Sequence, residues 1–401
     1  MPEERCDDAE PCSNDTFDPV TTTPFEEEPP EPECTKHDDC NDGHLCTDDE
    51  ECVPVPELEE CARSRSMTPF FLPPNLPDEV LTLAVIDADE DDALDLVLMA
   101  SGAGQLVLGP ADEPPRPLPL PEDAAPHALL AIDVDGDGHE DLVALDGAQM
   151  GRFVVLRNDG TGIFEPMAEV VFVGSVRQPS AIDWNGDGIV DVALTVAGRP
   201  SVLIGDGLGG FANAITLSDS ISHGLTTGTF HGTARGVAAS ANGQNRIQLW
   251  RPPDATPRGE VEIETSISTL LAIDTGGSPG SGLVAHGLIK GHSSRWHLVE
   301  SKRANSDHLH AHAILDASYV AAAGDVDGDG ETDVVFAATR ALHIFYGQAG
   351  QDDEPLFACR STVHLSSNRV PTSIAVGDLD GDGRDEIALA NGVVVTAFTS
   401  G

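Results

Sequence analysis

Acidic residues at a fixed spacing are the part of this sequence best suited to chemistry. From Asp325 to Asp333, acidic side chains stand at positions 1, 3, 5 and 9, and glycines stand at positions 4 and 6. The pattern recurs four more times, in copies that begin at Asp87, Asp133, Asp183 and Asp378. Calcium takes about six to eight oxygen ligands in a flexible shell, which suits so dense a set of carboxylates. Glycine reaches positive φ without a Cβ clash, so positions 4 and 6 permit the tight turn that brings the carboxylates together.

We assign to each loop the side chains at positions 1, 3, 5 and 9 and the backbone carbonyl of position 7 as calcium ligands. The side-chain ligands are Asp87, Asp89, Asp91 and Asp95; Asp133, Asp135, Asp137 and Asp141; Asp183, Asn185, Asp187 and Asp191; Asp325, Asp327, Asp329 and Asp333; and Asp378, Asp380, Asp382 and Glu386. The carbonyl ligands are those of Ala93, His139, Ile189, Glu331 and Arg384. An EF-hand is excluded, because it needs a bidentate Glu at position 12. Position 12 is apolar in all five loops: Leu98, Ala144, Leu194, Phe336 and Leu389.

The five loops differ in quality. The first has Glu90 and Asp92 where the others have glycine, so we expect it to be the weakest site. The third has Asn185 at position 3, which is still an oxygen ligand but one charge weaker. A single loop of this kind would be explained equally well as a solvated turn. Five copies in the same context favour metal binding, with up to five calcium ions.

The apolar segments around the loops define a longer repeat. Aligning them reveals two eroded copies, which begin at Gly228 and Asp274 and lack the side chains to hold calcium. The unit starts are then 87, 133, 183, 228, 274, 325 and 378, a spacing of 45 to 53 residues. In the second unit, strands are expected over 128–132, 142–145, 153–156 and 164–173. Seven units of about four short strands predict an all-β fold, a seven-bladed β-propeller.

The loops and the apolar runs after them resemble the FG-GAP and VCBS-type repeats of integrin-α-like propellers, over residues 67 to 401. The Phe-Gly and Gly-Ala-Pro ends of the FG-GAP repeat are missing, which places the resemblance nearer the VCBS branch. The resemblance implies that the calcium loops lie on one face of the propeller and that a protein or glycan ligand binds the other. On that face we expect the loops Val173–Pro179, Ser218–Gly224 and Leu365–Pro371, which carry Arg177, His223 and Arg369.

The propeller is expected over residues 62–401, and its last unit has room for only two strands after the calcium loop. The apolar segment Met67–Leu72 precedes the first unit and could supply the missing outer strand of the seventh blade. A strand from each end of the chain in one blade would remove the open edge and close the ring.

Residues 1–61 form a separate acidic, cysteine-rich segment that includes a Glu/Pro run from Phe25 to Pro32. The cysteines of the segment are Cys6, Cys12, Cys34, Cys40, Cys46, Cys52 and Cys61, and the eighth of the chain is Cys359. So short a segment cannot bury a useful core, so we expect a small disulfide-stapled module. A metal site is the alternative, although the five residues between successive cysteines are more than the short spacing typical of zinc-binding cysteine pairs. Because seven is odd, we expect a Cys61–Cys359 disulfide that ties the module to the ring.

Composition bounds the partners and the location. The formal net charge of −48 in 401 residues would repel nucleic acid and anionic membranes. No apolar stretch reaches the ~20 residues needed to cross a bilayer, and residues 1–5 are not a signal peptide. Disulfides and open calcium sites favour an oxidising compartment, so we expect a secreted, extracellular or cell-surface protein.

Several other motifs have ordinary explanations. Gly205–Gly210 fits the dinucleotide pattern, but no helix follows it, so we interpret it as a hairpin turn. His308, His310 and His312 alternate, and His286, His292 and His297 are near them in sequence. These histidines could form a transition-metal site, but we prefer the interpretation that they lie on an exposed outer strand. Trp250 and Trp296 could stack on a sugar, and Asn14 begins a glycosylation acceptor.

No catalytic motif is present: there is no Gly-x-Ser-x-Gly elbow, His-Glu-x-x-His helix or P-loop. The carboxylates gather at repeated loops, whereas catalysis would need one asymmetric cluster. We therefore expect a calcium-binding adhesion or recognition module rather than an enzyme. Two alternatives stay open: a calcium-dependent polysaccharide-active enzyme, which the resemblance also implies, and a structural subunit that assembles with other surface proteins.

Overall fold

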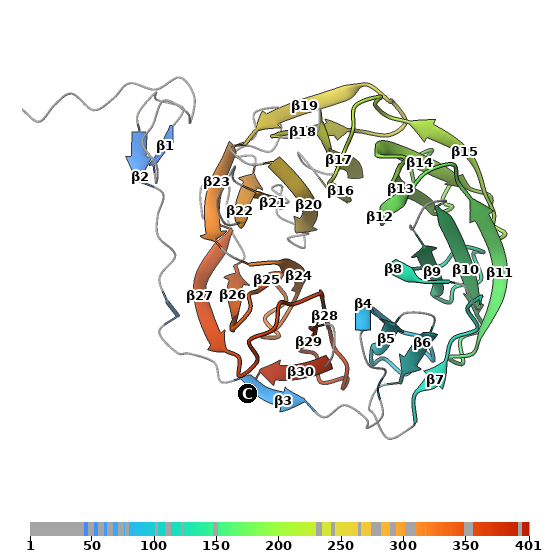
Figure 1. Ribbon diagram of the computed structural model, residues 1–401, viewed down its shortest axis with the longest axis horizontal. Helices are drawn as coiled ribbons and strands as arrows, with labels where there is room; N and C mark the ends of the chain where they lie inside the picture. The colour runs from blue at the N-terminus through green and yellow to red at the C-terminus, as the bar shows by residue number, and fades with distance from the viewer. Residues whose placement is uncertain are drawn as a thin grey trace, which may run out of the picture. The chain divides into compact units, whose positions relative to one another are not determined.

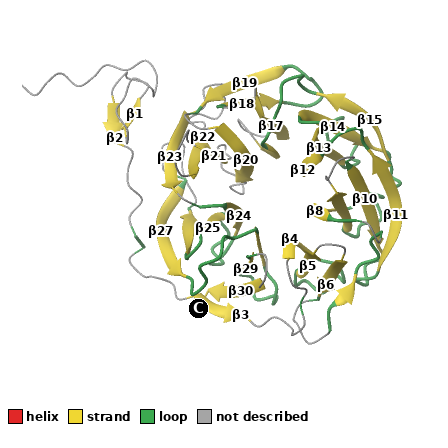
Figure 2. Ribbon diagram, in the orientation of Figure 1, coloured by secondary structure: helices red, strands yellow, loops and turns green. Residues whose placement is uncertain are grey.

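The structure is a computed structural model of the 401-residue chain. It describes residues 44–46, 52–54, 60–61, 67–70, 76, 80–100, 103–108, 114–121, 124–146, 151–229, 235–241, 245–263, 266–273, 282–288, 294–300, 310–316, 318–348, 356–391 and 395–400. All regular secondary structure in these residues is β, and no helix is among them (Figure 2). By contacts the chain divides into two units, Met1–Val55 and Pro56–Gly401.

The second unit is a propeller of seven four-stranded antiparallel sheets, as predicted (Figure 1). Blades 1 to 3 are β4 (Val80–Ile86), β5 (Asp95–Ala100), β6 (Ala103–Val107) and β7 (Arg116–Pro117); β8 (Pro126–Ile132), β9 (Asp141–Asp146), β10 (Arg152–Asn158) and β11 (Phe164–Val171); and β12 (Val176–Ile182), β13 (Asp191–Val196), β14 (Arg199–Gly205) and β15 (Phe211–Thr216). Blades 4 and 5 are β16 (Leu225–Thr229), β17 (Arg235–Ala241), β18 (Arg246–Trp250) and β19 (Pro257–Glu262); and β20 (Ser266–Ile273), β21 (Gly282–Leu288), β22 (Ser294–Glu300) and β23 (His310–Asp316). Blades 6 and 7 are β24 (Val320–Gly324), β25 (Asp333–Ala337), β26 (Ala341–Gly347) and β27 (Phe357–His364); and β28 (Ser373–Gly377), β29 (Glu386–Ala390), β30 (Val395–Ser400) and β3 (Met67–Phe70).

The core of the propeller lies between the blades. Seven buried apolar clusters each combine side chains of two neighbouring blades, one cluster for each interface of the ring. At the interface of blades 5 and 6, for example, Trp296 packs edge-on against Phe336 with 5.1 Å between ring centroids. The second strands are almost wholly buried because both faces of a blade pack on neighbours, which explains why their sequences are continuous apolar runs.

The seventh blade joins the two ends of the propeller. Its outer strand β3 pairs antiparallel with β30, from Met67 opposite Ser400 to Phe70 opposite Ala397. In Figure 1 the blue β3 accordingly lies beside the red β30. Strands from the beginning and the end of the propeller thus belong to one sheet, and each of the seven blades has four strands.

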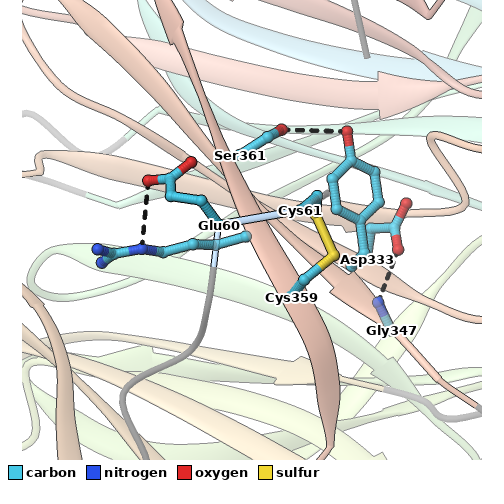
Figure 3. The surroundings of a disulfide bond; sticks show 8 residues. Glu60, Cys61, Asp333, Gly347, Cys359 and Ser361 are labelled. Atoms are coloured by element: carbon cyan, nitrogen blue, oxygen red, sulfur yellow. Dashed lines mark hydrogen bonds and ion pairs between the residues drawn. A yellow bond between two sulfur atoms is a disulfide. The ribbon is translucent and has the colours of Figure 1, made fainter. Parts of the chain in front are cut away.

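A disulfide next to this closure links Cys61 to Cys359, with 5.2 Å between Cα atoms (Figure 3). Cys359 lies on β27, the outer strand of blade 6. Glu60 forms a parallel bridge with Arg360, and the Cys61 N–H donates to the Arg360 carbonyl at 2.9 Å. Residues 60 and 61 therefore attach to the propeller, and the division between the units falls after Val55 rather than after Cys61.

The first unit contains a two-stranded antiparallel sheet, β1 (His44–Cys46) and β2 (Cys52–Pro54), in which Cys46 lies opposite Cys52. Cys6, Cys12, Cys34, Cys40 and Asn14 lie outside the described residues, as do the side chains of Cys46 and Cys52. The disulfide-stapled module remains a prediction.

Candidate metal loops

Each acidic loop joins the first strand of a blade to its second strand. The first strands of neighbouring blades contact one another around the centre of the ring, so these are the innermost strands. Because equivalent strands run in the same direction, all five loops open on one face, which we call the loop face. The loops belong to blades 6, 7, 1, 2 and 3, which are consecutive around the ring. In blades 4 and 5 the eroded loops, 230–234 and 274–281, lie outside the described residues.

The carboxylate at position 1 organises the turn. In the second loop, Asp133 accepts the N–H of Gly136 at 2.7 Å and the N–H of Gly138 at 3.0 Å. The loops that begin at Asp183, Asp325 and Asp378 repeat both bonds. The glycines have positive φ, 76° and 94° in the second loop, as their places in the pattern require. In the first loop Glu90 and Asp92 take φ of 58° and 69°, a conformation that is less favourable for residues with a Cβ.

The carboxylate at position 9 is fully buried in every loop and holds the loop to its blade. One oxygen of Asp333 accepts the N–H of Val326, at position 2, at 2.9 Å, and the other accepts the N–H of Gly347, on the third strand, at 2.8 Å. Asp141 and Asp191 form equivalent pairs of bonds. Position 9 is therefore a structural anchor as well as a candidate ligand, a role that sequence reasoning missed.

Position 2 fixes the other side of the loop. The residues at this position are buried and apolar, and each packs into the cluster between its own blade and the next. They are Ala88, Val134, Trp184, Val326 and Leu379. An apolar residue between two carboxylates is the sequence signal that could have revealed this packing.

The loops gather their carboxylates into groups whose oxygens lie within 4.8 Å of one another. Positions 1, 3 and 9 meet in three loops, through Asp133, Asp135 and Asp141; Asp325, Asp327 and Asp333; and Asp378, Asp380 and Glu386. In the first loop positions 1, 3 and 5 meet instead, through Asp87, Asp89 and Asp91. In the third loop, the amide of Asn185 donates to Asp187 at 2.8 Å. The structure thus brings together three of the four predicted side-chain ligands in four loops. Position 5 is outside the closest group in three of these loops, and position 9 is outside it in the first.

The buried carboxyls are electrostatically suited to a cation. Burial raises the pKa of the Asp333 carboxyl to about 8, of Glu386 to about 7 and of Asp141 to about 6. A divalent cation would favour the ionised form and offset the cost of burying it. In the first loop, Oδ1 of Asp87 is buried and accepts no hydrogen bond. These groups could hold a metal ion, and oxygen donors alone suit a hard cation.

In the second loop, a basic side chain from the third strand of the blade contacts the carboxylates. Arg157, on the third strand of its blade, donates to Asp135 at 2.8 Å and to Asp137 at 2.6 Å. The equivalent residues in blades 3 and 6 are Ile204 and Tyr346, since each also precedes the residue that donates to position 9. Blade 2 therefore supplies its own positive charge to positions 3 and 5.

Hydrogen bonds connect the loops of neighbouring blades. Asp385 accepts the N–H of Asp325 at 2.7 Å, and the Leu94 N–H donates to the Asp378 carbonyl at 2.6 Å. Between the first two loops, His139 contacts Glu90, and this carboxylate raises the pKa of the imidazole. The loops of blades 6, 7, 1 and 2 thus form one connected arc across the blade in which the chain ends meet.

The remaining candidate residues are placed as follows. Gly205–Gly210 is the turn between β14 and β15, two strands, so it is not a dinucleotide site. Trp250 and Trp296 are fully buried and cannot stack on a sugar. His286 packs on Trp296, which is its partner on the neighbouring strand β22. His297 follows Trp296 on β22, so the side chains of His286 and His297 point to opposite faces of the blade. His292 and His308 and the side chains of His310 and His312 lie outside the described residues, so this cluster is not assembled in the part that the structure describes.

On the face opposite the loops, His223 and Arg369 are exposed on their predicted connections. The prediction that 173–179 is entirely loop was wrong, because β12 begins at Val176 and places Arg177 on the innermost strand. Val176 is the only buried side chain in 173–179, so the segment lacks the alternating apolar pattern that indicates a strand.

Comparison with known proteins agrees with this architecture. The family model of the FG-GAP-like repeat matches residues 133–194, from the loop of blade 2 into blade 3, and residues 325–389, from the loop of blade 6 into blade 7. The chain is an FG-GAP repeat β-propeller protein. The closer likeness to the VCBS branch stays a prediction.

Solved structures share the fold. Two crystal structures of BBS1N in complex with ARL6DN, one soaked with lead and one with mercury, are each 12% identical to this chain, with TM-scores of 0.56 and 0.55. Each alignment covers 84% of this chain and 98% of the other. At this identity the likeness extends to the fold alone. No curated protein sequence matches the chain. The described residues contain no helix long and apolar enough to span a membrane.

Proposed function

We propose that this protein is a secreted or cell-surface calcium-binding propeller that acts as a binding module for a protein or glycan. Calcium holds the acidic loops, and the rigid ring presents its opposite face to the partner. The observation that carries the proposal is the buried carboxylate at position 9, which is repeated in five blades and lies beside two other carboxylates in three of them. Calcium is favoured over magnesium because the loops offer many carboxylates without the strict octahedral shell that magnesium demands.

Partner binding, rather than catalysis, is supported by the distribution of the acidic groups. They repeat from blade to blade as structural units, and no described cluster combines an acid, a base and a nucleophile. BBS1N, a propeller of similar fold, is in complex with ARL6DN in its crystal structures, which gives one example of a protein partner on this architecture. A polysaccharide-active enzyme and a structural subunit of a surface assembly remain the competing proposals.

Thermal unfolding in calcium and in chelator tests the metal part of the proposal. A ligand that binds only the folded chain stabilises it in proportion to the logarithm of its concentration. We expect the Tm to fall by more than ~10 °C when EDTA replaces 1 mM calcium, and to be restored by calcium but only weakly by magnesium. An unchanged Tm would refute the metal assignment.

A further inference from the structure

Exposed apolar side chains gather on the face opposite the loops. The described residues include eight large hydrophobic side chains that are exposed. Six lie on connections into an innermost strand or at the adjoining strand ends: Leu81, Val171, Val173, Ile221, Tyr319 and Val370. The other two, Ile163 and Leu208, lie on turns between third and fourth strands, and these turns are on the loop face.

Part of this set, together with the exposed Ala197, lies on neighbouring segments of blades 2 to 4. Val171, Val173, Ala197 and Ile221 make up this group, which we call the apolar rim. A Cβ added at Gly174 would lie 2.7 Å from the Ala197 Cβ, and one added at Gly198 would lie 3.5 Å from Cγ2 of Ile221. The three segments are therefore in contact, and Val173 is 94% exposed at one end of them.

Hydrogen bonds hold the rim in place. The Ala197 N–H donates to the Ser175 carbonyl at 2.8 Å, and the Ser222 N–H donates to the Gly198 carbonyl at 2.6 Å. Ala197 and Gln178 have positive φ of 50° and 55°, and among the described non-glycine residues only the first acidic loop has others. The Gln178 amide donates to the carbonyls of His223 and Ser268, which belong to the next two blades. A surface fixed in this way loses little entropy when a partner binds.

The chemistry of the rim selects a protein rather than a glycan. Its side chains are aliphatic, and all three tryptophans of the chain are fully buried, so no tryptophan ring is available at the rim to pack on a sugar. Arg177 and Arg199 flank the rim and are exposed, and Arg199 has only a 3.7 Å ion pair with Asp219. Because the dense acidic groups lie on the loop face, the carboxylates of a partner would be attracted to the rim rather than to that face.

We propose that the apolar rim is the docking site for a protein segment whose aliphatic side chains are flanked by carboxylates. The proposal rests on the proposed binding function and gives it a place and a partner chemistry. Val173 and Ile221 would contact the aliphatic side chains, and Arg177 and Arg199 would pair with the carboxylates.

A phage library of random 12-residue peptides, selected on the calcium-loaded full chain, tests the proposal. We expect the enriched peptides to combine Leu, Ile or Val with Asp or Glu. Val173→Asp and Ile221→Asp should each weaken their binding at least tenfold, because a carboxylate is placed in an apolar contact and repels the acidic peptide. The control variants Ile163→Asp and Leu208→Asp, at exposed apolar positions on the loop face, should change it less than twofold. Arg177→Glu should weaken it and reduce its dependence on salt.

Three results would overturn the proposal: no enriched peptide, enriched peptides without that composition, or equal weakening by rim and loop-face variants. The Tm gain on adding calcium, measured for each variant, shows that the fold is intact. It also separates the two proposals. If the rim binds peptides as expected but calcium does not raise the Tm, the metal function alone is refuted. If calcium raises the Tm but the rim does not bind as expected, the rim proposal alone is refuted.

Discussion

The carboxylate at position 9 has the clearest individual role at the residue scale. It is buried, it accepts backbone N–H groups from the loop and the third strand, and it lies among the other candidate ligands. Position 5 differs in the loop that begins at Asp325, where its carboxylate, Asp329, accepts the N–H of Glu331 on the loop surface. The two positions should therefore respond differently to mutation.

Asp333→Ala should lower the free energy of unfolding by about 2 to 4 kcal/mol even in EDTA, because two buried N–H groups lose their acceptor. Asp329→Asn should leave the stability in EDTA unchanged within about 0.5 kcal/mol and reduce only the gain from calcium. Urea unfolding in EDTA and in calcium measures both. Equal behaviour of the two variants in EDTA would contradict the anchoring role of position 9.

The raised pKa values predict how stability depends on pH. Without metal, Asp141, Glu386 and Asp333 keep protons in the folded chain up to about pH 6, 7 and 8, whereas the unfolded chain loses them near pH 4. Their contribution to stability is therefore present below about pH 4 and is lost as the pH rises toward 8. In EDTA the Tm should fall from pH 5 to pH 8, and the gain from calcium should grow over the same range.

General charge repulsion would act in the same direction, so a variant is needed as a control. Asp333→Asn removes the carboxyl with the highest of these pKa values. The Tm in EDTA should therefore change less between pH 6 and pH 8 in this variant than in the wild type. A slope that is the same in the variant and the wild type would assign the pH dependence to overall charge instead.

At the scale of the element, the third strand of each blade determines how similar loops differ. In blades 2, 3 and 6 it supplies an N–H that anchors position 9, and the residue before that donor differs from blade to blade. This residue is Arg157 in blade 2 but Ile204 and Tyr346 in blades 3 and 6. A guanidinium at positions 3 and 5 competes with a cation for the same carboxylates.

Arg157→Gln should raise the calcium affinity of the second loop about fivefold, which corresponds to ~1 kcal/mol for a partly exposed ion pair. Calcium titration by calorimetry, with the other four loops disabled at position 1, isolates this site. Arg258→Gln, which removes an exposed ion pair with Asp254 away from the acidic loops, is the control. Unchanged or weaker affinity in Arg157→Gln would show that the arginine supports the loop instead.

The elements also show what could be predicted from sequence. The loops and the number of blades were accessible because carboxylates and glycines recur at fixed positions, as at Gly328 and Gly330, and because apolar runs follow at regular intervals. The contact of Arg157 was not accessible, because it depends on the register of β10 against β9. The apolar rim could not be predicted from the sequence either, since the exposed Val173 and the buried Val176 are the same residue type in one short segment.

At the scale of the whole molecule, the ring depends on contacts between residues far apart in sequence. The strand β3 completes blade 7, and the Cys61–Cys359 disulfide joins residues 298 apart at the neighbouring blade. The loops of blades 6, 7, 1 and 2 connect across the same closure. The acidic loops and the chain closure therefore lie in the same part of the ring, so a metal bound by these loops would stabilise the closure.

Replacing Cys61 and Cys359 together by Ser should lower the free energy of unfolding by about 2 to 5 kcal/mol, since a long loop in the unfolded chain is no longer constrained. Tryptophan fluorescence during urea unfolding follows the propeller specifically, because Trp184, Trp250 and Trp296 are all buried in it. A reducing agent should shift the wild type toward the variant and leave the variant unchanged. Identical unfolding of variant and wild type would show that β3 closes the ring without help from the disulfide.

The number of calcium ions bound per chain is the most direct test of the central claim. Equilibrium dialysis of the chelator-treated protein against calcium in physiological salt should give saturable binding of four to five ions, with the first loop contributing the weakest. Replacing Asp325 and Asp378 together by Asn should remove two of them. An absence of saturable binding, or a number that these two substitutions leave unchanged, would contradict the claim that the acidic loops are calcium sites.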